Sequence, residues 1–166
     1  IETTNKFKII GLIDKEETKE VLKYPVLGND FDIITYKNNA SSALITIGQI
    51  KTHEVRLKMF NKILEIGFDT PVIISPLAHV SKYSQIDLGT IVMHRATVNV
   101  NSYVGKNCII NSNALIEHDC VISDNCHIAT GTIINGNVKI GKNSFVGSGS
   151  IIKQGIEIPE NSFIKA

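Results

Sequence analysis

The chain has 166 residues, with 17 basic against 16 acidic side chains and a formal net charge of +1. This balance excludes the strongly basic surface typical of nucleic-acid-binding proteins, and no apolar run approaches the roughly 20 residues that a membrane helix needs. With no signal peptide at its start and an odd count of three cysteines, we expect a reduced, cytoplasmic protein with neither nucleic-acid nor membrane partners.

The first 70 residues combine strand and helix patterns. Residues 7–14 and 42–48 are apolar and β-branched, which predicts two buried strands. A helix should begin with Thr52 as its N-cap and end at Gly67. Its apolar side consists of Val55, Met59, Phe60, Ile63 and Leu64. Alternating strands and helices favour a parallel sheet with crossover helices, as in nucleotide-binding units.

The remaining sequence is a six-residue repeat. From Ile74 to Ile164, an isoleucine or valine occurs at every sixth residue, usually followed four residues later by a small one. This period predicts a parallel β-helix in which three hexads form one triangular coil, with about five coils stacked at the inter-strand spacing. Cys108, Cys120 and Cys126 all occupy the small position, so we expect buried core residues rather than a metal site or disulfide.

Residues 18 apart should stack, which assigns the outward residues to three faces. Face A presents Ile91, Ile109, His127, Phe145 and Phe163. Face B presents Thr97, Leu115, Ile133 and Ile151. Face C presents Gln85, Tyr103, Val121, Lys139 and Glu157. The apolar stripes of faces A and B predict that face A of one copy meets face B of the next in a homotrimer.

The corner that precedes face A should have left-handed backbone, because its residues are of the types that tolerate it. They are Gly89, Asn107, Asn125, Asn143 and Asn161.

Two histidines interrupt the repeat. His118 is followed by Asp119 and stacks one coil away from Gly136, whereas His127 lies on face A. An imidazole with a carboxylate neighbour is the minimum for a general base, and a glycine leaves room for an acyl group and offers an N–H to an oxyanion. The alternatives are a solvated corner for His118, a conformational role for Asp119 and interface packing for His127. The spacing of His94, His118 and His127 does not match a zinc site, so we expect no metal.

At these residues the sequence resembles a known group. The Ile-Glu-His-Asp-Cys-Val-Ile segment at 116–122, His127, Gly-Asn-Val-Lys-Ile-Gly at 136–141 and the segments 11–14 and 45–48 are similar to left-handed β-helix acetyltransferases of bacterial surface-sugar synthesis. These are the UDP-4-amino-sugar N-acetyltransferases of bacillosamine and perosamine-type pathways and the sialic-acid O-acetyltransferases. Members also have a glycine-rich phosphate loop near the N-terminus, and their β-helix continues past the last hexads with a further coil and a tail. Neither feature occurs in this sequence.

The resemblance implies an α/β, partial Rossmann-like N-terminal domain followed by an all-β left-handed parallel β-helix of hexapeptide repeats. Residues 1–70 would be a partial nucleotide-sugar-binding domain, and residues 71–166 the acetyltransferase domain. A homotrimer with active sites between subunits would transfer acetyl from acetyl-CoA, without a metal. His118 would be the general base, oriented by Asp119, and Gly136 would offer its N–H to the thioester oxygen.

The resemblance also implies binding residues. The cofactor acetyl-CoA would contact His127 of the neighbouring subunit, Ser148 and Ala166. The nucleotide would contact Asp14, Lys15 and Gly48.

The preferred interpretation is N-acetylation of a nucleotide-linked amino sugar. We expect the transfer to be direct, because Cys120 points inward and no other nucleophile lies beside His118. O-acetylation of a sialic acid is the alternative enzyme function, and a non-catalytic scaffold or regulatory subunit is the alternative from another class. A metal-dependent hydratase is a third possibility. The sequence leaves the acceptor sugar, the acetylated position and N- versus O-transfer open.

Overall fold

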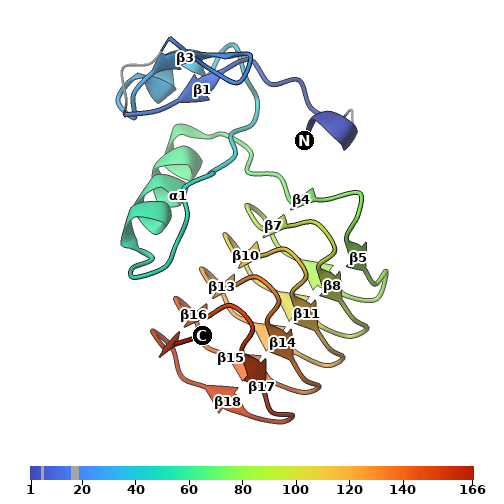
Figure 1. Cartoon of the computed structure of the whole chain (residues 1–166). Helices are drawn as coiled ribbons and strands as arrows, with labels where there is room; N and C mark the ends of the chain where they lie inside the picture. Colours follow the sequence, from blue (N-terminus) through green and yellow to red (C-terminus); the bar gives the residue numbers. More distant parts are fainter. Residues whose placement is uncertain (5, 16–18) are drawn as a thin grey trace.

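The computed structural model describes residues 1–4, 6–15 and 19–166. A small α/β region lies at one end of a stack of triangular coils, and the chain runs from the α/β region into the stack (Figure 1). This arrangement confirms the predicted fold class, an N-terminal α/β region followed by a left-handed parallel β-helix. Within the described part, no helix is long and apolar enough to cross a membrane.

Three parallel sheets of two-residue strands form the β-helix. Face A consists of β4 (Ile73–Ile74), β7 (Ile91–Val92), β10 (Ile109–Ile110), β13 (His127–Ile128), β16 (Phe145–Val146) and β19 (Phe163–Ile164). Face B consists of β5 (His79–Val80), β8 (Thr97–Val98), β11 (Leu115–Ile116), β14 (Ile133–Ile134) and β17 (Ile151–Ile152). Face C consists of β6 (Gln85–Ile86), β9 (Tyr103–Val104), β12 (Val121–Ile122), β15 (Lys139–Ile140) and β18 (Glu157–Ile158).

The register of these sheets confirms the stacking predicted from the hexads. Residues 18 apart are paired, as Ile109 is with His127 and Leu115 with Ile133. The leading aliphatic residue of each hexad points into the core, where Ile110, Ile116 and the others of the central coils are fully buried. Each such side chain stabilises the fold by about 1.5–3 kcal/mol relative to an exposed one.

The three cysteines are also where the repeat places them. Cys108, Cys120 and Cys126 are free, fully buried and part of the core. Burial raises the pKa of the Cys108 and Cys120 thiols, because the charged thiolate loses its hydration. The prediction of small core residues is confirmed.

The corner before face A is a ladder of asparagines. Their φ angles are 54° for Asn107, 57° for Asn125, 63° for Asn143 and 59° for Asn161, and Gly89 has 70°. Each amide donates to the next along the stack, over 3.0, 3.2 and 3.1 Å. The predicted left-handed corner is confirmed, and its side chains link successive coils.

The N-terminal region contains a small mixed sheet and one long helix. Its elements are η1 (Glu2–Thr4), β1 (Leu12–Ile13), β2 (Glu20–Val21), β3 (Tyr24–Gly28), η2 (Asp32–Tyr36) and α1 (Glu54–Ile66). The strand order is β1-β3-β2, with β1 parallel and β2 antiparallel to β3. Helix α1 buries Phe60 and Ile63 against Ile33, Ile45 and Phe68, and Ile13 of β1 packs against this cluster.

Two strand predictions in this region need correction. The strand expected over residues 7–14 is limited to Leu12–Ile13. The segment 42–48 contains no strand, only an isolated bridge between Ser42 and Asp69. The reason is that the carbonyls of Ile45 and Ile47 accept hydrogen bonds from a side chain of α1, so they do not pair with another strand.

The boundaries of α1 also differ in part from the prediction. The helix ends at Gly67, with φ of 90°, as expected. Its N-cap is His53, so Thr52 is not the cap, although the Thr52 hydroxyl accepts the Glu54 N–H at 3.2 Å. The buried side also differs from the predicted one. It contains Arg56 in addition to Phe60 and Ile63, while Val55 and Leu64 are exposed.

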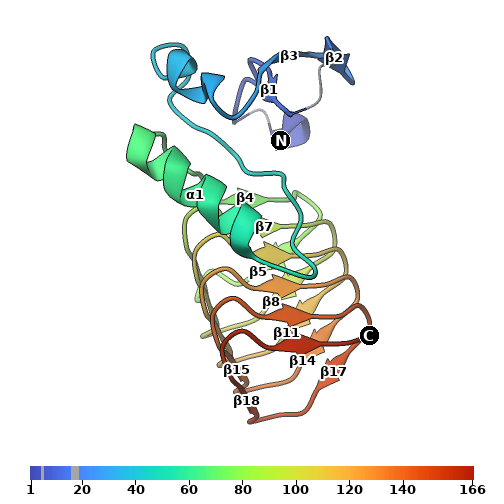
Figure 2. The same ribbon diagram turned by 90° about the vertical axis from the view of Figure 1, so that its left-hand side faces the viewer.

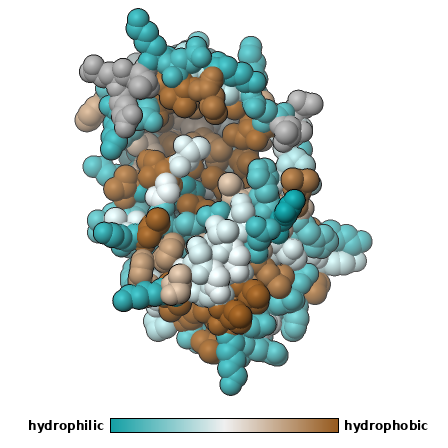
Figure 3. Space-filling model, in the orientation of Figure 1, coloured by the Kyte–Doolittle hydropathy of each residue, from teal (hydrophilic) through white to brown (hydrophobic). Residues whose placement is uncertain are grey.

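Part of face A is covered by the chain itself. Helix α1 lies along the first coils, next to β4 and β7 (Figure 2). Phe60 packs over Gly89, where an added Cβ would lie 2.5 Å from its ring, and Ile109 is buried. The chain itself thus covers this upper part of face A, and the predicted contact of face A with face B of a neighbouring copy stays a prediction. Ile151 on face B stays 69% exposed, and apolar patches remain on the surface of the lower coils (Figure 3).

The asparagine ladder yields a test at Asn143. Asn143→Ala should lower the free energy of unfolding by about 2–3 kcal/mol, because it loses the ladder bonds and because alanine lacks the side-chain amide that lets asparagine tolerate left-handed backbone. Asn143→Gly, the matched control, should lose about 1 kcal/mol less, since glycine adopts this backbone freely. Chemical denaturation measures both, and equal losses for the two variants would contradict this role of the corner.

Candidate active site

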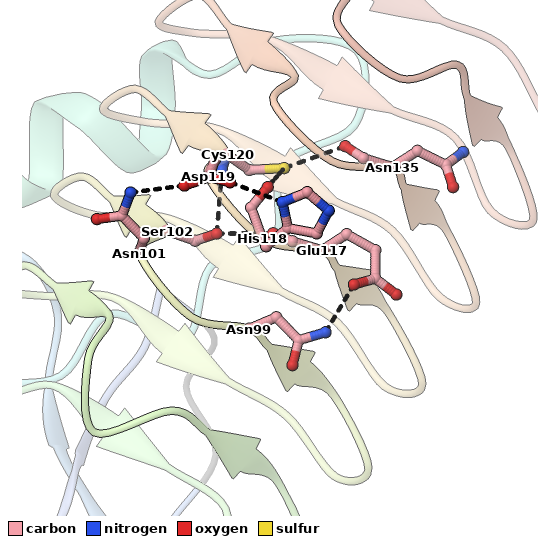
Figure 4. A network of polar contacts seen from close by, with 8 residues as sticks. All are labelled: Asn99, Asn101, Ser102, Glu117, His118, Asp119, Cys120 and Asn135. Atoms are coloured by element: carbon pink, nitrogen blue, oxygen red, sulfur yellow. Dashed lines mark hydrogen bonds and ion pairs between the residues drawn. The ribbon is translucent and has the colours of Figure 1, made fainter.

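His118 lies at the corner between β11 and β12, beside a short chain of polar groups (Figure 4). Its Nδ1 is 2.7 Å from Oδ2 of Asp119, and Asn101 donates to the other carboxylate oxygen at 2.6 Å. The hydrogen bonds from Asn101 and His118 lower the pKa of Asp119. Because a carboxylate only accepts, Nδ1 of His118 bears a proton, and in the neutral imidazole Nε2 is then the acceptor.

The left-handed backbone conformation of Asp119 determines where its side chain points. Its φ of 60° matches 59° at Asn101 and 56° at Asn137, the residues that occupy the same corner in the neighbouring coils. The conformational alternative for Asp119 and its pairing with His118 are therefore compatible. The left-handed turn directs the carboxylate toward the imidazole of the preceding residue.

The imidazole of His118 lies over Gly136. A Cβ added at Gly136 would be 2.7 Å from both Nε2 and Cε1 of the ring, a separation that side chains do not tolerate. Only glycine at this position leaves the ring in place. The His118 side chain is 50% exposed, so Nε2 lies beside backbone on one side and remains reachable by a ligand on the other.

The backbone on both sides of His118 is held by polar contacts with neighbouring coils. The Ser102 hydroxyl donates to the carbonyl of Glu117 at 2.7 Å and accepts the N–H of Cys120 at 3.1 Å. The Cys120 thiol points inward and donates to the carbonyl of Asn135 at 3.1 Å. Asn99 donates to the Glu117 carboxylate at 2.8 Å. Cys120 is thus a core residue and faces away from the position that a ligand of His118 would occupy.

His127 belongs to a separate and buried network. Its Nδ1 donates to the carbonyl of Gln49, and its Nε2 accepts from the amide of Asn111 at 3.1 Å. Its ring meets that of Phe145 edge to face, with centroids 5.2 Å apart. Burial lowers the pKa of His127, and the charge of Arg56 acts in the same direction. Both ring nitrogens have partners in the same chain, and the expected contact with a cofactor stays a prediction.

The other predicted site residues lie apart from His118. Asp14 and Lys15 follow β1, and the N–H of Asp14 donates to the carbonyl of Gly28 at 3.0 Å. Gly48 is exposed, and no atom lies within 4 Å of a Cβ placed on it. Ser148 and Ala166 are exposed at a third place, 18 residues apart on successive coils.

Two buried polar residues that contact the β-helix have no clear signal in the sequence. Gln49 and Arg56 are buried and link the N-terminal region to the β-helix. An arginine in an amphipathic helix normally indicates the solvent side, so the pattern gave no reason to select Arg56. Among the described residues, no group of three histidine, cysteine or acidic side chains could hold a metal ion.

Comparisons with known proteins match both halves of the chain. The family model of the bacterial transferase hexapeptide matches residues 101–136 and 119–154, and that of the PglD N-terminal domain matches residues 1–63. A comparison with curated proteins finds no match.

Solved structures extend this similarity over nearly the whole chain. The acetyltransferase domain of PglB from Neisseria gonorrhoeae, in complex with acetyl coenzyme A, is 26% identical with a TM-score of 0.84, over 94% of this chain and 75% of that one. A mutant of GDP-perosamine N-acetyl transferase from Caulobacter crescentus, in complex with CoA and GDP-perosamine, is 27% identical with a TM-score of 0.89, over 94% and 73%. WeeI from Acinetobacter baumannii shares the fold at 22% identity and a TM-score of 0.63, over 91% and 80%.

The buried His127 predicts a pH-dependent stability. Its pKa lies below the ordinary value of 6.5 in the folded protein, so the unfolded chain binds a proton first as the pH falls. The contribution of His127 is complete above pH 6.5 and is lost as the pH falls through the folded pKa. The wild type should therefore lose more stability between about pH 7.5 and pH 5.5 than His127→Asn, which can still donate to Gln49 but does not titrate. Urea denaturation at both pH values measures this, and equal pH slopes would contradict it.

Proposed function

Because this chain belongs to the hexapeptide-repeat sugar acetyltransferases, we propose that it transfers the acetyl group of acetyl-CoA to the amino group of a nucleotide-linked 4-amino sugar. The chain is thus an acyltransferase, and the proposal concerns its acceptor and its catalytic residues. The observation that supports the choice of residues is the placement of His118 between the Asp119 carboxylate and the backbone of Gly136.

In the proposed reaction, His118 is the general base. Acetyl-CoA supplies the acetyl group as an activated thioester. Nε2 of His118 takes a proton from the sugar amine as its nitrogen forms the new bond to the acetyl carbon, and it returns this proton to the sulfur when the carbon–sulfur bond breaks. Asp119 holds the Nδ1 proton and stabilises the imidazolium that forms. Gly136 leaves space next to Nε2 and would direct its N–H to the oxygen that becomes negative.

A covalent acetyl-enzyme is not part of the proposal. The candidate nucleophile nearest in sequence, Cys120, has its thiol in the core, hydrogen-bonded to the carbonyl of Asn135. Burial raises the pKa of this thiol, which keeps it protonated. Direct transfer between the two substrates is consistent with both observations.

The remaining contacts are proposed from the resemblance. Residues 1–70 would form the nucleotide-sugar-binding part, with Asp14, Lys15 and Gly48 at the nucleotide, and residues 71–166 the acetyltransferase part. The cofactor would contact His127, Ser148 and Ala166, the last two being exposed on successive coils. A homotrimer in the cytoplasm would complete the sites between subunits, with the exposed face B as one side of the contact.

The acceptor is tested by a substrate panel. Thiol release from acetyl-CoA should be fast with a UDP- or GDP-linked 4-amino sugar and slow with free sialic acid, with the acetyl group found on nitrogen by mass spectrometry. Faster transfer to the sialic acid hydroxyl would identify the O-acetyltransferase alternative. If none of the acceptors on the panel supported thiol release, the non-catalytic alternative would be favoured.

Replacing the proposed base gives the first kinetic prediction. His118→Ala should lower kcat by about 10²–10⁴-fold, the usual contribution of a positioned general base, while acetyl-CoA binding measured by calorimetry persists. His79→Ala serves as the control, since His79 is exposed in β5 at the start of the coils. A near-normal kcat for His118→Ala would exclude this residue as the base.

Gly136 provides an independent prediction. Gly136→Ala places a Cβ where the His118 ring lies and should displace the ring, which lowers kcat by about 10²-fold. The melting temperature should change little, because the ring is half-exposed and can move outward. Gln154→Ala, one coil further at the equivalent position, is the matched control. If Gly136→Ala kept its full kcat, the glycine would have no part in positioning the base.

A further inference from the structure

Arg56 is a buried arginine whose partners are all backbone carbonyls. Its side chain is 1% exposed, and none of the ion pairs in the described part involves it. Nη1 donates to the carbonyls of Ile45 and Ile47, both at 2.9 Å. Nε donates to Asn107 at 3.3 Å and Nη2 to Gly89 at 3.5 Å. Burial lowers the pKa of Arg56 to about 10, so the guanidinium is still charged at neutral pH.

These contacts connect three separate parts of the molecule. The guanidinium belongs to α1, two of its partners lie in the irregular segment 45–47, and the other two lie at the left-handed corner of the β-helix. The planar fork of an arginine can reach several carbonyls at once, which a single ammonium group cannot do. The position of segment 45–47 is therefore fixed relative to the corner by one side chain.

Gly48 lies between this contact and a second one. On its N-terminal side, the Ile47 carbonyl is held by Arg56. On its C-terminal side, the Gln49 side chain donates to the carbonyl of Asn125 at 2.6 Å, and the Gln49 carbonyl accepts from His127. Gly48 itself is exposed, with open space around it. An accessible backbone position is thus held from both sides against a rigid stack of coils.

We infer that Arg56 is a positioning residue that sets the location of the nucleotide contact at Gly48 relative to the base at His118. This inference rests on the proposed function, in which one acceptor molecule binds at Gly48 of one subunit through its nucleotide and at His118 of the neighbouring subunit through its amine. Both contacts must be satisfied by a molecule of fixed length, so the separation of the two points must be fixed as well. The β-helix fixes the position of His118, and Arg56 fixes the position of Gly48 relative to the β-helix.

The burial of a charge at this position supports a geometric role. Phe60 and Ile63 already pack α1 against the apolar residues of the N-terminal region. An apolar side chain at position 56 would avoid the desolvation of a charged group, so stability alone gives no reason for an arginine. What an apolar residue cannot do is bind the carbonyls of the 45–47 segment and of the corner together.

The test measures the steady-state kinetics of the wild-type protein and of the Arg56→Met and Arg56→Lys variants. Both variants should raise the KM for the nucleotide amino sugar by about tenfold and lower kcat severalfold, with the KM for acetyl-CoA unchanged. Lysine should not restore the wild-type KM, because the fork is lost. In Arg56→Ala, added guanidinium ion should restore part of the lost affinity for the nucleotide sugar, and added methylammonium should not.

Ile63→Ala is the matched control for a purely structural role. Ile63 is buried in the same helix, but its aliphatic side chain cannot hydrogen-bond these carbonyls, so its truncation should lower the melting temperature and leave the nucleotide-sugar KM unchanged. Arg56 variants that likewise only melt earlier would overturn the inference while leaving the acetyltransferase proposal intact. Absence of transfer by the wild type would overturn the proposed function, and with it the reason to position Gly48.

Discussion

The left-handed corners, stacked at a constant spacing of 18 residues, are the constraint on which the rest of the structure depends. Each strand of the β-helix has two residues, too few to hold a sheet in register by itself. The corners supply the register, because asparagine and glycine adopt a positive φ there and the asparagine amides bond from coil to coil. Every outward side chain of the inner coils therefore has a fixed neighbour one coil above and one below it.

Both proposed functional arrangements depend on this constraint. At one corner, the left-handed turn of Asp119 directs its carboxylate to His118, and the stacking places the His118 ring over Gly136. At another, the turn carbonyls of Gly89, Asn107 and Asn125 accept hydrogen bonds from Arg56 and Gln49. The same geometry thus holds the proposed base and anchors the segment that contains Gly48.

The sequence was sufficient to predict the features that the period determines and insufficient for those that depend on distant packing. The three faces, the buried cysteines and the neighbours of His118 can be found by counting residues, because stacking is strictly periodic. The prediction of a strand at 42–48 is wrong because the Arg56 guanidinium donates hydrogen bonds to the carbonyls of Ile45 and Ile47, and nothing in the local pattern indicates these bonds. The burial of His127 depends on Gln49, 78 residues earlier, so the period could place the ring outward but could not identify the segment that covers it.

A crystal structure with CoA and a nucleotide-linked 4-amino sugar tests most directly whether the acceptor amine meets His118 above Gly136. We expect the amine nitrogen within about 3 Å of Nε2 of His118, or one water away, with the nucleotide at the Gly48 segment. An amine bound against another side chain, out of reach of Nε2, would contradict this expectation.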